Sequence, residues 1–167
     1  MRSAFSSLLL IGIIVAAISA YPFIVSPRPP NQSTSIVINK AINRMYLYEN
    51  GRLVGRYTVA TGKEVSLTPE GDLVIVVKEA SDQGLGQDRI FGTRWLGLKT
   101  PDAPDGLKYG IHGTNEPGSI GEHASAGCVR MSQADLEEVY ARVPLGTLVR
   151  IQRGWAWHRH LVMWFSK

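Results

Sequence analysis

The fold of this 167-residue chain is decided by the stretch Arg44-Met45-Tyr46-Leu47-Tyr48-Glu49-Asn50-Gly51-Arg52-Leu53-Val54-Gly55-Arg56-Tyr57-Thr58-Val59. Two runs rich in β-forming residues flank the dipeptide Asn50-Gly51. Both positions of a two-residue hairpin turn need φ > 0, which Asn and Gly adopt most readily. The stretch therefore predicts a β-hairpin, with strands at 44–48 and 52–59.

Further β-rich segments lie on both sides of this hairpin. The additional strands that we predict are 35–39, 73–77, 91–98, 107–112 and 147–151. The run 73–77 is continuously apolar, which is typical of a strand covered on both faces. The polar segment 79–89 contains two glycines and is predicted to be a mobile loop.

One helix is predicted near the C-terminal end of the domain. Ser132 is a favourable N-cap, with Asp135 three residues later. Apolar residues then recur at helical spacing: Leu136, Val139, Tyr140 and Val143. Pro144 ends this pattern. Six or more strands and one helix predict a mostly-β domain with one short helix.

Residues 1–25 are predicted to be a signal peptide or a membrane anchor. No charged residue lies between Ser3 and Pro27, Arg2 supplies a positive N-terminal region, and the small residues at 17–20 resemble a cleavage site. The apolar run continues to Val25 and so also reaches the roughly 20 residues that cross a bilayer. Both alternatives predict export, to the periplasm or to the cell-wall side of the inner membrane.

The rest of the chain is predicted to have three parts. Residues 26–34 are Pro-rich and typical of an extended linker, 35–152 form the folded domain, and 153–167 form a tail. The tail holds three of the four tryptophans, with basic residues among them. Such a mixture is typical of segments at a membrane interface, and packing of these aromatic side chains onto the domain is the alternative.

Cys128 is the only cysteine of the chain, so it cannot form an intramolecular disulfide. In an exported protein an unpaired thiol is a liability unless it has a chemical role. A cysteine nucleophile acts as the thiolate, and its usual base is a histidine. His112 ends a predicted strand, and the Gly-rich segment after it allows both side chains to meet across neighbouring strand ends. This arrangement predicts a cysteine acyl-transfer enzyme.

Two alternatives stay open for Cys128 at this point. A free cysteine packs well as a small apolar residue, so it could be buried and inert. A zinc site could use His112, His123 and Cys128, although their spacings of eleven and five residues match no compact ligand motif.

Three segments, in this order, closely resemble the active-site signature of the L,D-transpeptidase family: Gly110-Ile111-His112-Gly113-Thr114-Asn115-Glu116-Pro117, Ser119-Ile120-Gly121 and Ser125-x-Gly127-Cys128-Val129-Arg130-Met131. Members of this family cross-link peptidoglycan through a cysteine. Segments 57–63, 68–71, 91–96 and 143–151 are similar to other motifs of the family. The resemblance covers about residues 34–152 and implies a β-sandwich-like catalytic domain, in agreement with the predicted strands.

The resemblance also implies roles for individual residues. Cys128 would be the nucleophile, His112 its base, and the backbone carbonyl of Gly113 the group that orients the histidine ring. The substrate-binding residues assigned on the same basis are Arg130, Ser125, Gly127, Tyr109 and Asn115.

Some of these roles have alternatives. Arg130 could bind a substrate carboxylate or pair within the fold. Ser125 could be structural or form a hydrogen bond. The glycine at 127 would let the backbone approach a substrate carbonyl, with nearby amides as an oxyanion hole.

Ala126 is a departure from the family pattern, because many members have a histidine directly before the Gly-Cys pair. That histidine is not the expected base, so the pair of Cys128 and His112 is unaffected. A second proton relay or donor contact at this position is what the departure puts in doubt.

The expected activity is acyl transfer from a stem-peptide donor, through a thioester on Cys128, to an amine acceptor, without a metal or a cofactor. The expected partners are peptidoglycan stem peptides and, through the N-terminal segment, a membrane; carbapenems are expected inhibitors. Hydrolysis of the same bond by an L,D-carboxypeptidase and a catalytically weakened wall-binding module are the alternatives. The net charge of +4 is scattered, so nucleic-acid binding is not expected.

Overall fold

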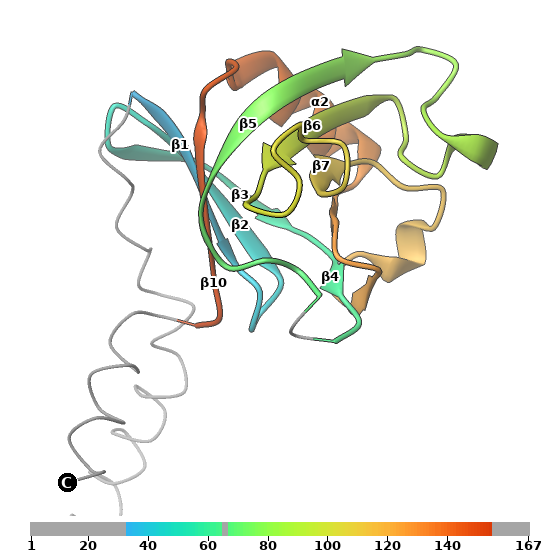
Figure 1. Ribbon diagram of the computed structural model, residues 1–167, viewed down its shortest axis with the longest axis horizontal. Helices are drawn as coiled ribbons and strands as arrows, with labels where there is room; N and C mark the ends of the chain where they lie inside the picture. Colours follow the sequence, from blue (N-terminus) through green and yellow to red (C-terminus); the bar gives the residue numbers. More distant parts are fainter. Residues whose placement is uncertain (1–32, 65–66, 155–167) are drawn as a thin grey trace, which may run out of the picture.

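A computed structural model describes residues 33–64 and 67–154 (Figure 1). These residues form a mostly-β domain with a single α-helix, as the sequence predicts. None of their helices has the length and apolar character needed to span a membrane. The predicted signal or anchor segment, nearly all of the linker and most of the tail lie outside the described residues and stay predictions.

Most strands belong to one sheet of eight. In sheet order they are β3 (Arg52–Thr58), β2 (Arg44–Glu49), β1 (Thr34–Asn39), β10 (Leu148–Gln152), β5 (Gly71–Ala80), β6 (Arg94–Lys99), β7 (Gly110–His112) and β9 (Val129–Arg130). The pairs β1–β10 and β7–β9 are parallel, and the other neighbours are antiparallel. A second, two-stranded sheet joins β4 (Thr61–Gly62) to β8 (His123–Ser125). Two short 3₁₀ helices, η1 (Gln87–Arg89) and η2 (Pro117–Ser119), lie in connections.

The predicted hairpin is confirmed as β2 and β3. Asn50 and Gly51 have φ of 49° and 74°, the left-handed values that the turn requires. Glu49 pairs with Arg52 next to the turn. Because β3 is the first strand of the sheet order, the hairpin forms one edge of the main sheet.

Three predicted strands have clearly different limits in the structure. The strand predicted at 91–98 begins only at Arg94, because Gly92 has a φ of 67° and its carbonyl closes the preceding loop by accepting from the Leu85 amide. The strand predicted at 107–112 is reduced to β7. Conversely, β5 continues past the predicted end at Val77, because β6 pairs with it as far as Ala80.

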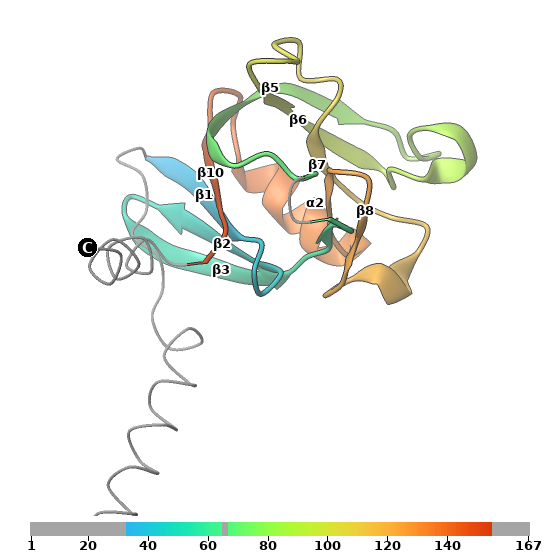
Figure 2. The same cartoon turned by 60° about the horizontal axis from the view of Figure 1, so that its bottom comes forward.

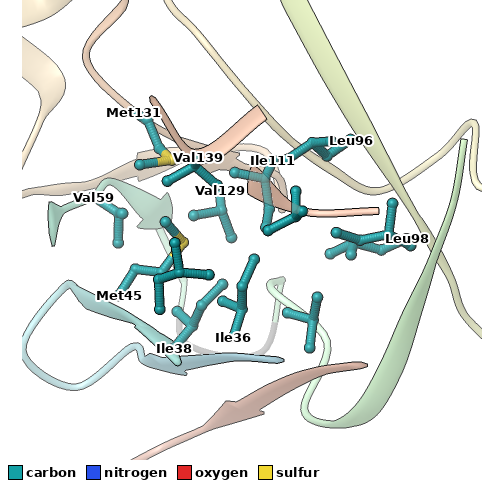
Figure 3. Close-up of a cluster of buried hydrophobic side chains, with 14 of the residues drawn as sticks. Ile36, Ile38, Met45, Val59, Leu96, Leu98, Ile111, Val129, Met131 and Val139 are labelled. Carbon is teal, nitrogen blue, oxygen red and sulfur yellow. The ribbon is translucent and has the colours of Figure 1, made fainter. Parts of the chain in front are cut away.

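The sheet is strongly curled, and its two halves face each other across one apolar core, which gives the expected sandwich-like arrangement (Figure 2). Figure 3 shows Ile36 and Ile38 of β1 on one side and Leu96 and Ile111 of β6 and β7 on the other. All four side chains are fully buried. Burial of such side chains is the main stabilising contribution to the fold.

The helix α2 (Gln133–Arg142) lies in the hollow of the sheet (Figure 2). It begins as predicted, since Ser132 Oγ accepts a hydrogen bond from the Asp135 amide. Leu136 and Val139 are its buried residues. At its C-terminal end, Lys78 Nζ donates to the carbonyls of Tyr140 and Val143 at 2.8 and 2.7 Å, and thereby satisfies acceptors that a helix end leaves unpaired.

Candidate active site

The predicted base lies on β7, and the predicted nucleophile directly precedes β9, the strand that pairs with β7. They pair in parallel, with Ile111 opposite Val129 and His112 opposite Arg130. Ile111 and Val129 both point into the core. Because side chains alternate along a strand, His112 and the residue before Val129, Cys128, lie on the other face of the two strands.

His112 is held by aromatic rings and is only 3% exposed. Its ring stacks on Trp95, with centroids 5.5 Å apart and an angle of 17°. Phe91 meets it edge-on at 4.9 Å and 79°. Neither Phe91 nor Trp95 had a predicted role at the site, although both belong to a segment that resembles a family motif.

The tautomer of His112 follows from its hydrogen bond. Its Nδ1 lies 2.5 Å from the carbonyl oxygen of Gly113. A carbonyl can only accept, so Nδ1 carries the proton and donates it. The neutral ring then has its lone pair on Nε2, which is the atom that can act as a base.

Burial gives both groups of the pair a neutral resting state. It lowers the pKa of His112 from 6.5 to about 4, with a smaller contribution from the charge of Arg130 and an opposing one from the bond to Gly113. Burial also raises the pKa of the Cys128 thiol. A hydrogen bond with the Gly110 backbone and the positive charge of Arg130 both lower this pKa, but they offset the effect of burial only in part. The half-buried Sγ lies 3.7 Å from the carbonyl oxygen of Lys108. Near pH 7 the imidazole and the thiol are therefore both uncharged.

The turn before Cys128 is closed by Ser125. Ser125 is buried, and its hydroxyl donates to the Cys128 carbonyl at 2.6 Å and accepts from the Gly127 amide at 3.0 Å. Ser125 thus has the hydrogen-bonding role that was one of its alternatives. The Gly127 amide is already used in this bond, so it is not available to an oxyanion without breaking it.

Gly127 is required at its position for steric reasons. Its φ is 139°, which side-chain-bearing residues rarely adopt. An added Cβ would lie 2.8 Å from the Leu67 carbonyl oxygen and 3.0 Å from the Tyr109 ring. Tyr109 is partly buried against the core, so in this structure it packs beside the nucleophile turn.

Arg130 and Asn115 bind other parts of the protein. Arg130 Nη1 lies 2.6 Å from Glu116 Oε2 and 3.3 Å from Ser119 Oγ, the arrangement expected if it pairs within the fold. Asn115 Nδ2 donates to the Asp88 carbonyl at 3.2 Å and so ties the segment after His112 to the loop between β5 and β6. Neither contact involves Cys128.

A hollow of about 190 Å³ is lined in part by the two aromatic rings that contact His112. Its walls are Glu79, Leu85, Gly86, Phe91, Trp95 and Leu107. Phe91 and Trp95 are the rings that contact His112, and Leu107 immediately precedes Lys108, whose carbonyl contacts the thiol. The hollow can therefore receive an apolar part of a ligand beside the two rings that hold His112.

The zinc alternative finds no geometric support in the described part of the chain. No group of three or more His, Cys, Asp or Glu side chains there could hold a metal ion. His123 instead lies on β8, with its Nδ1 3.0 Å from Thr61 Oγ1.

Comparison with known proteins gives consistent matches. Residues 33–151 match the model of the YkuD family, described as an L,D-transpeptidase catalytic domain. The chain is 38% identical to the "Putative L,D-transpeptidase YkuD" of Bacillus licheniformis, over 84% of this chain and 80% of that protein. It is 36% identical to the "Putative L,D-transpeptidase YqjB" of Bacillus subtilis, over 70% and 69%.

Solved structures share the fold at lower identity. The L,D-transpeptidase (Yku) from Stackebrandtia nassauensis matches with a TM-score of 0.61 at 19% identity, over 78% of this chain and 60% of that one. L,D-transpeptidase 3 from Mycobacterium tuberculosis, solved with a faropenem-derived adduct, matches with 0.57 at 19% identity, over 72% and 60%. This chain thus spans about three fifths of their length.

Proposed function

Because this chain belongs to the YkuD L,D-transpeptidase catalytic domain family, we propose that it is a peptidoglycan L,D-transpeptidase that transfers an acyl group through Cys128. The observation that supports the proposal is that Cys128, the single thiol, directly precedes the strand paired with β7, which carries a buried histidine whose Nε2 is the basic nitrogen. Such a pair is the requirement for nucleophilic catalysis by cysteine. The substrates would be peptidoglycan stem peptides.

In the first half of the reaction, His112 Nε2 takes the proton of Cys128 Sγ. The sulfur attacks the carbonyl carbon between the third, L-configured centre of the donor stem and its terminal D-residue. The protonated imidazole then gives its proton to the nitrogen of the breaking amide bond. The D-residue leaves as an amine, and the rest of the donor stays on the enzyme as a thioester.

In the second half, an amine of the acceptor attacks the thioester carbon, and His112 takes a proton from its nitrogen. The C–S bond breaks, the new amide leaves, and the proton returns to the sulfur. Leu85 and Gly86 of the loop between β5 and β6 line the hollow beside the pair. We infer that this loop covers the bound donor, which would limit attack by water.

The same proposal extends to location and inhibitors. With the predicted N-terminal signal or anchor, the domain would act outside the cytoplasm, on the cell-wall side of the membrane. One structurally similar L,D-transpeptidase carries a faropenem-derived adduct, and we infer that β-lactams, carbapenems in particular, acylate Cys128 here.

Intact-mass spectrometry of the full chain in detergent, after incubation with a carbapenem, tests the proposal. We expect one covalent adduct on the parent protein and none on Cys128→Ser. His112→Ala should slow the adduct by roughly a hundredfold or more, the usual contribution of a general base. His123→Ala is the matched control, since His123 is bound to Thr61 and not to the pair, and it should keep the parent rate.

A folded parent protein without an adduct would sink the acyl-transfer proposal and favour the wall-binding alternative. Transfer and hydrolysis are then separated on a disaccharide tetrapeptide with an added acceptor amine. Cross-linked product supports the transpeptidase, whereas shortened stem alone would make the chain an L,D-carboxypeptidase.

A further inference from the structure

Lys40 carries a buried ammonium group that the proposed mechanism does not use. It directly follows β1, and only 2% of it is exposed. Its Nζ donates to the Thr68 carbonyl at 2.6 Å and lies 3.1 Å from Glu70 Oε1. An ammonium group is costly to remove from water, so lysines are rarely buried without such contacts. Lys40 therefore fastens the Thr68–Glu70 segment to a central strand of the sheet.

This segment borders the turn that carries the nucleophile. Leu67, directly before Thr68, places its carbonyl oxygen against Gly127, where an added Cβ would meet it at 2.8 Å. Thr68 Oγ1 also accepts from the Gly62 amide at 2.8 Å, which holds the segment to β4. Figure 1 shows β4 beside the orange part of the chain that leads into β9.

A second contact reaches the same turn from Lys63, which precedes this segment in the chain. Lys63, next to β4, donates its amide to the Ser125 carbonyl at 2.9 Å. Ser125 in turn bonds the Cys128 carbonyl and the Gly127 amide. The chain on either side of 65–66 thus touches Ser125 and Gly127, the two residues that shape the turn.

We propose that Lys40 is a positioning residue for Cys128. Its contact with Thr68 holds the Leu67 carbonyl against Gly127 and so keeps the thiol where His112 Nε2 can take its proton. Displacement of a reacting atom by about 1 Å can cost a hundredfold in rate, so a remote anchor of this kind matters for catalysis. The catalytic part of this inference rests on the proposed function, whereas the placement of the thiol does not.

The test compares Lys40→Met with Lys78→Met in the full chain. Lys78 is the matched control, because its Nζ also donates to main-chain carbonyls, but at the end of α2. Two rates are measured well below the unfolding temperature of each variant. One is acylation by a carbapenem, and the other is alkylation by iodoacetamide, which modifies the only thiol of the chain.

In Lys40→Met, we expect acylation to fall by about tenfold or more and alkylation to rise several-fold, because a looser turn exposes the thiol while misplacing it. Lys78→Met should lose stability but change neither rate by more than about twofold, since it leaves the turn intact. A Lys40→Met protein with both parent rates would overturn the proposal, as would equal rate changes in the two variants.

Two further outcomes are also decisive. If the parent protein is not acylated at all, the proposed function fails, and the alkylation rates alone decide whether Lys40 places the thiol. If Lys40→Met does not fold, Glu70→Gln replaces it, because Glu70 is half-exposed and its loss weakens the same anchor. In Glu70→Gln, slower acylation together with faster alkylation, both by smaller factors than expected for Lys40→Met, would support the proposal. Unchanged rates would overturn it.

Discussion

His112 belongs to β7 and Cys128 directly precedes the paired strand β9, yet the two side chains are held by different forces. His112 is fixed by apolar packing between Phe91 and Trp95, with one hydrogen bond to Gly113. Cys128 is fixed by a turn of short polar contacts around Ser125. Packing removes the imidazole from water and lowers its pKa, whereas the polar turn fixes the position of a thiol that is only half-buried.

The largest effect is expected from removing the ring on which His112 stacks. Trp95→Ala should lower the free energy of unfolding by about 3–5 kcal/mol, the usual cost of deleting a buried aromatic side chain. It should also raise the pKa of His112 toward 6.5, because water reaches the imidazole. Urea unfolding and NMR titration measure the two effects. Trp95→Phe, which keeps a ring, is the control and should retain the lowered pKa.

The next largest effect is the pH dependence of stability and of acylation that arises from His112. The folded pKa of about 4 lies below the unfolded 6.5, so the unfolded chain binds the proton first as the pH falls. Stability should therefore drop by about 3 kcal/mol between pH 6.5 and pH 4 and not further below, and acylation should be lost through pH 4. A His112→Gln variant should lack this part of the pH dependence. Titration of His112 near 6.5 would contradict the buried, neutral base.

On the cysteine side, Ser125→Ala should have an intermediate effect. The substitution leaves the Gly127 amide and the Cys128 carbonyl without their shared partner. Losing a buried hydrogen-bonding group of this kind costs about 1–3 kcal/mol. Thermal unfolding and the carbapenem acylation rate should both show the loss. Ser119→Ala, which removes a partly buried hydroxyl bonded to Glu116 and Arg130 and not to the turn, is the control, and equal effects of the two would contradict a special role for the turn.

The smallest effect is expected at the rim of the site. Glu116→Gln removes the charge opposite Arg130, and an exposed pair of this kind contributes less than about 1 kcal/mol to stability. If Arg130 serves only this pairing, Arg130→Gln should be equally mild and should leave KM for a stem-peptide donor within about twofold. A large rise in KM for Arg130→Gln alone would instead assign the guanidinium to a substrate carboxylate.

Local signals in the sequence were sufficient for the regular parts of the fold. The Asn50-Gly51 turn, the helix cap at Ser132 and the apolar run at 73–77 each act over a few neighbouring residues, and each forms the predicted element. The run is not covered on both faces as predicted, however, because only Leu73 and Ile75 are buried. The strands β4, β8 and β9 have only two or three residues, too few for an alternating pattern, and were not predicted. Their existence depends on partners elsewhere in the chain.

The sequence by itself determined that this protein has one thiol, a hairpin, a helix and an ordered set of motif residues around Cys128 and His112. Only the tertiary structure decided the tautomer and lowered pKa of His112, the engagement of Arg130 by Glu116, and the burial of Lys40. The physical reason is the distance along the chain over which each interaction acts. A turn or a cap is set by adjacent residues, whereas burial and electrostatic environment are set by groups such as Trp95 and Thr68 that folding brings from distant positions.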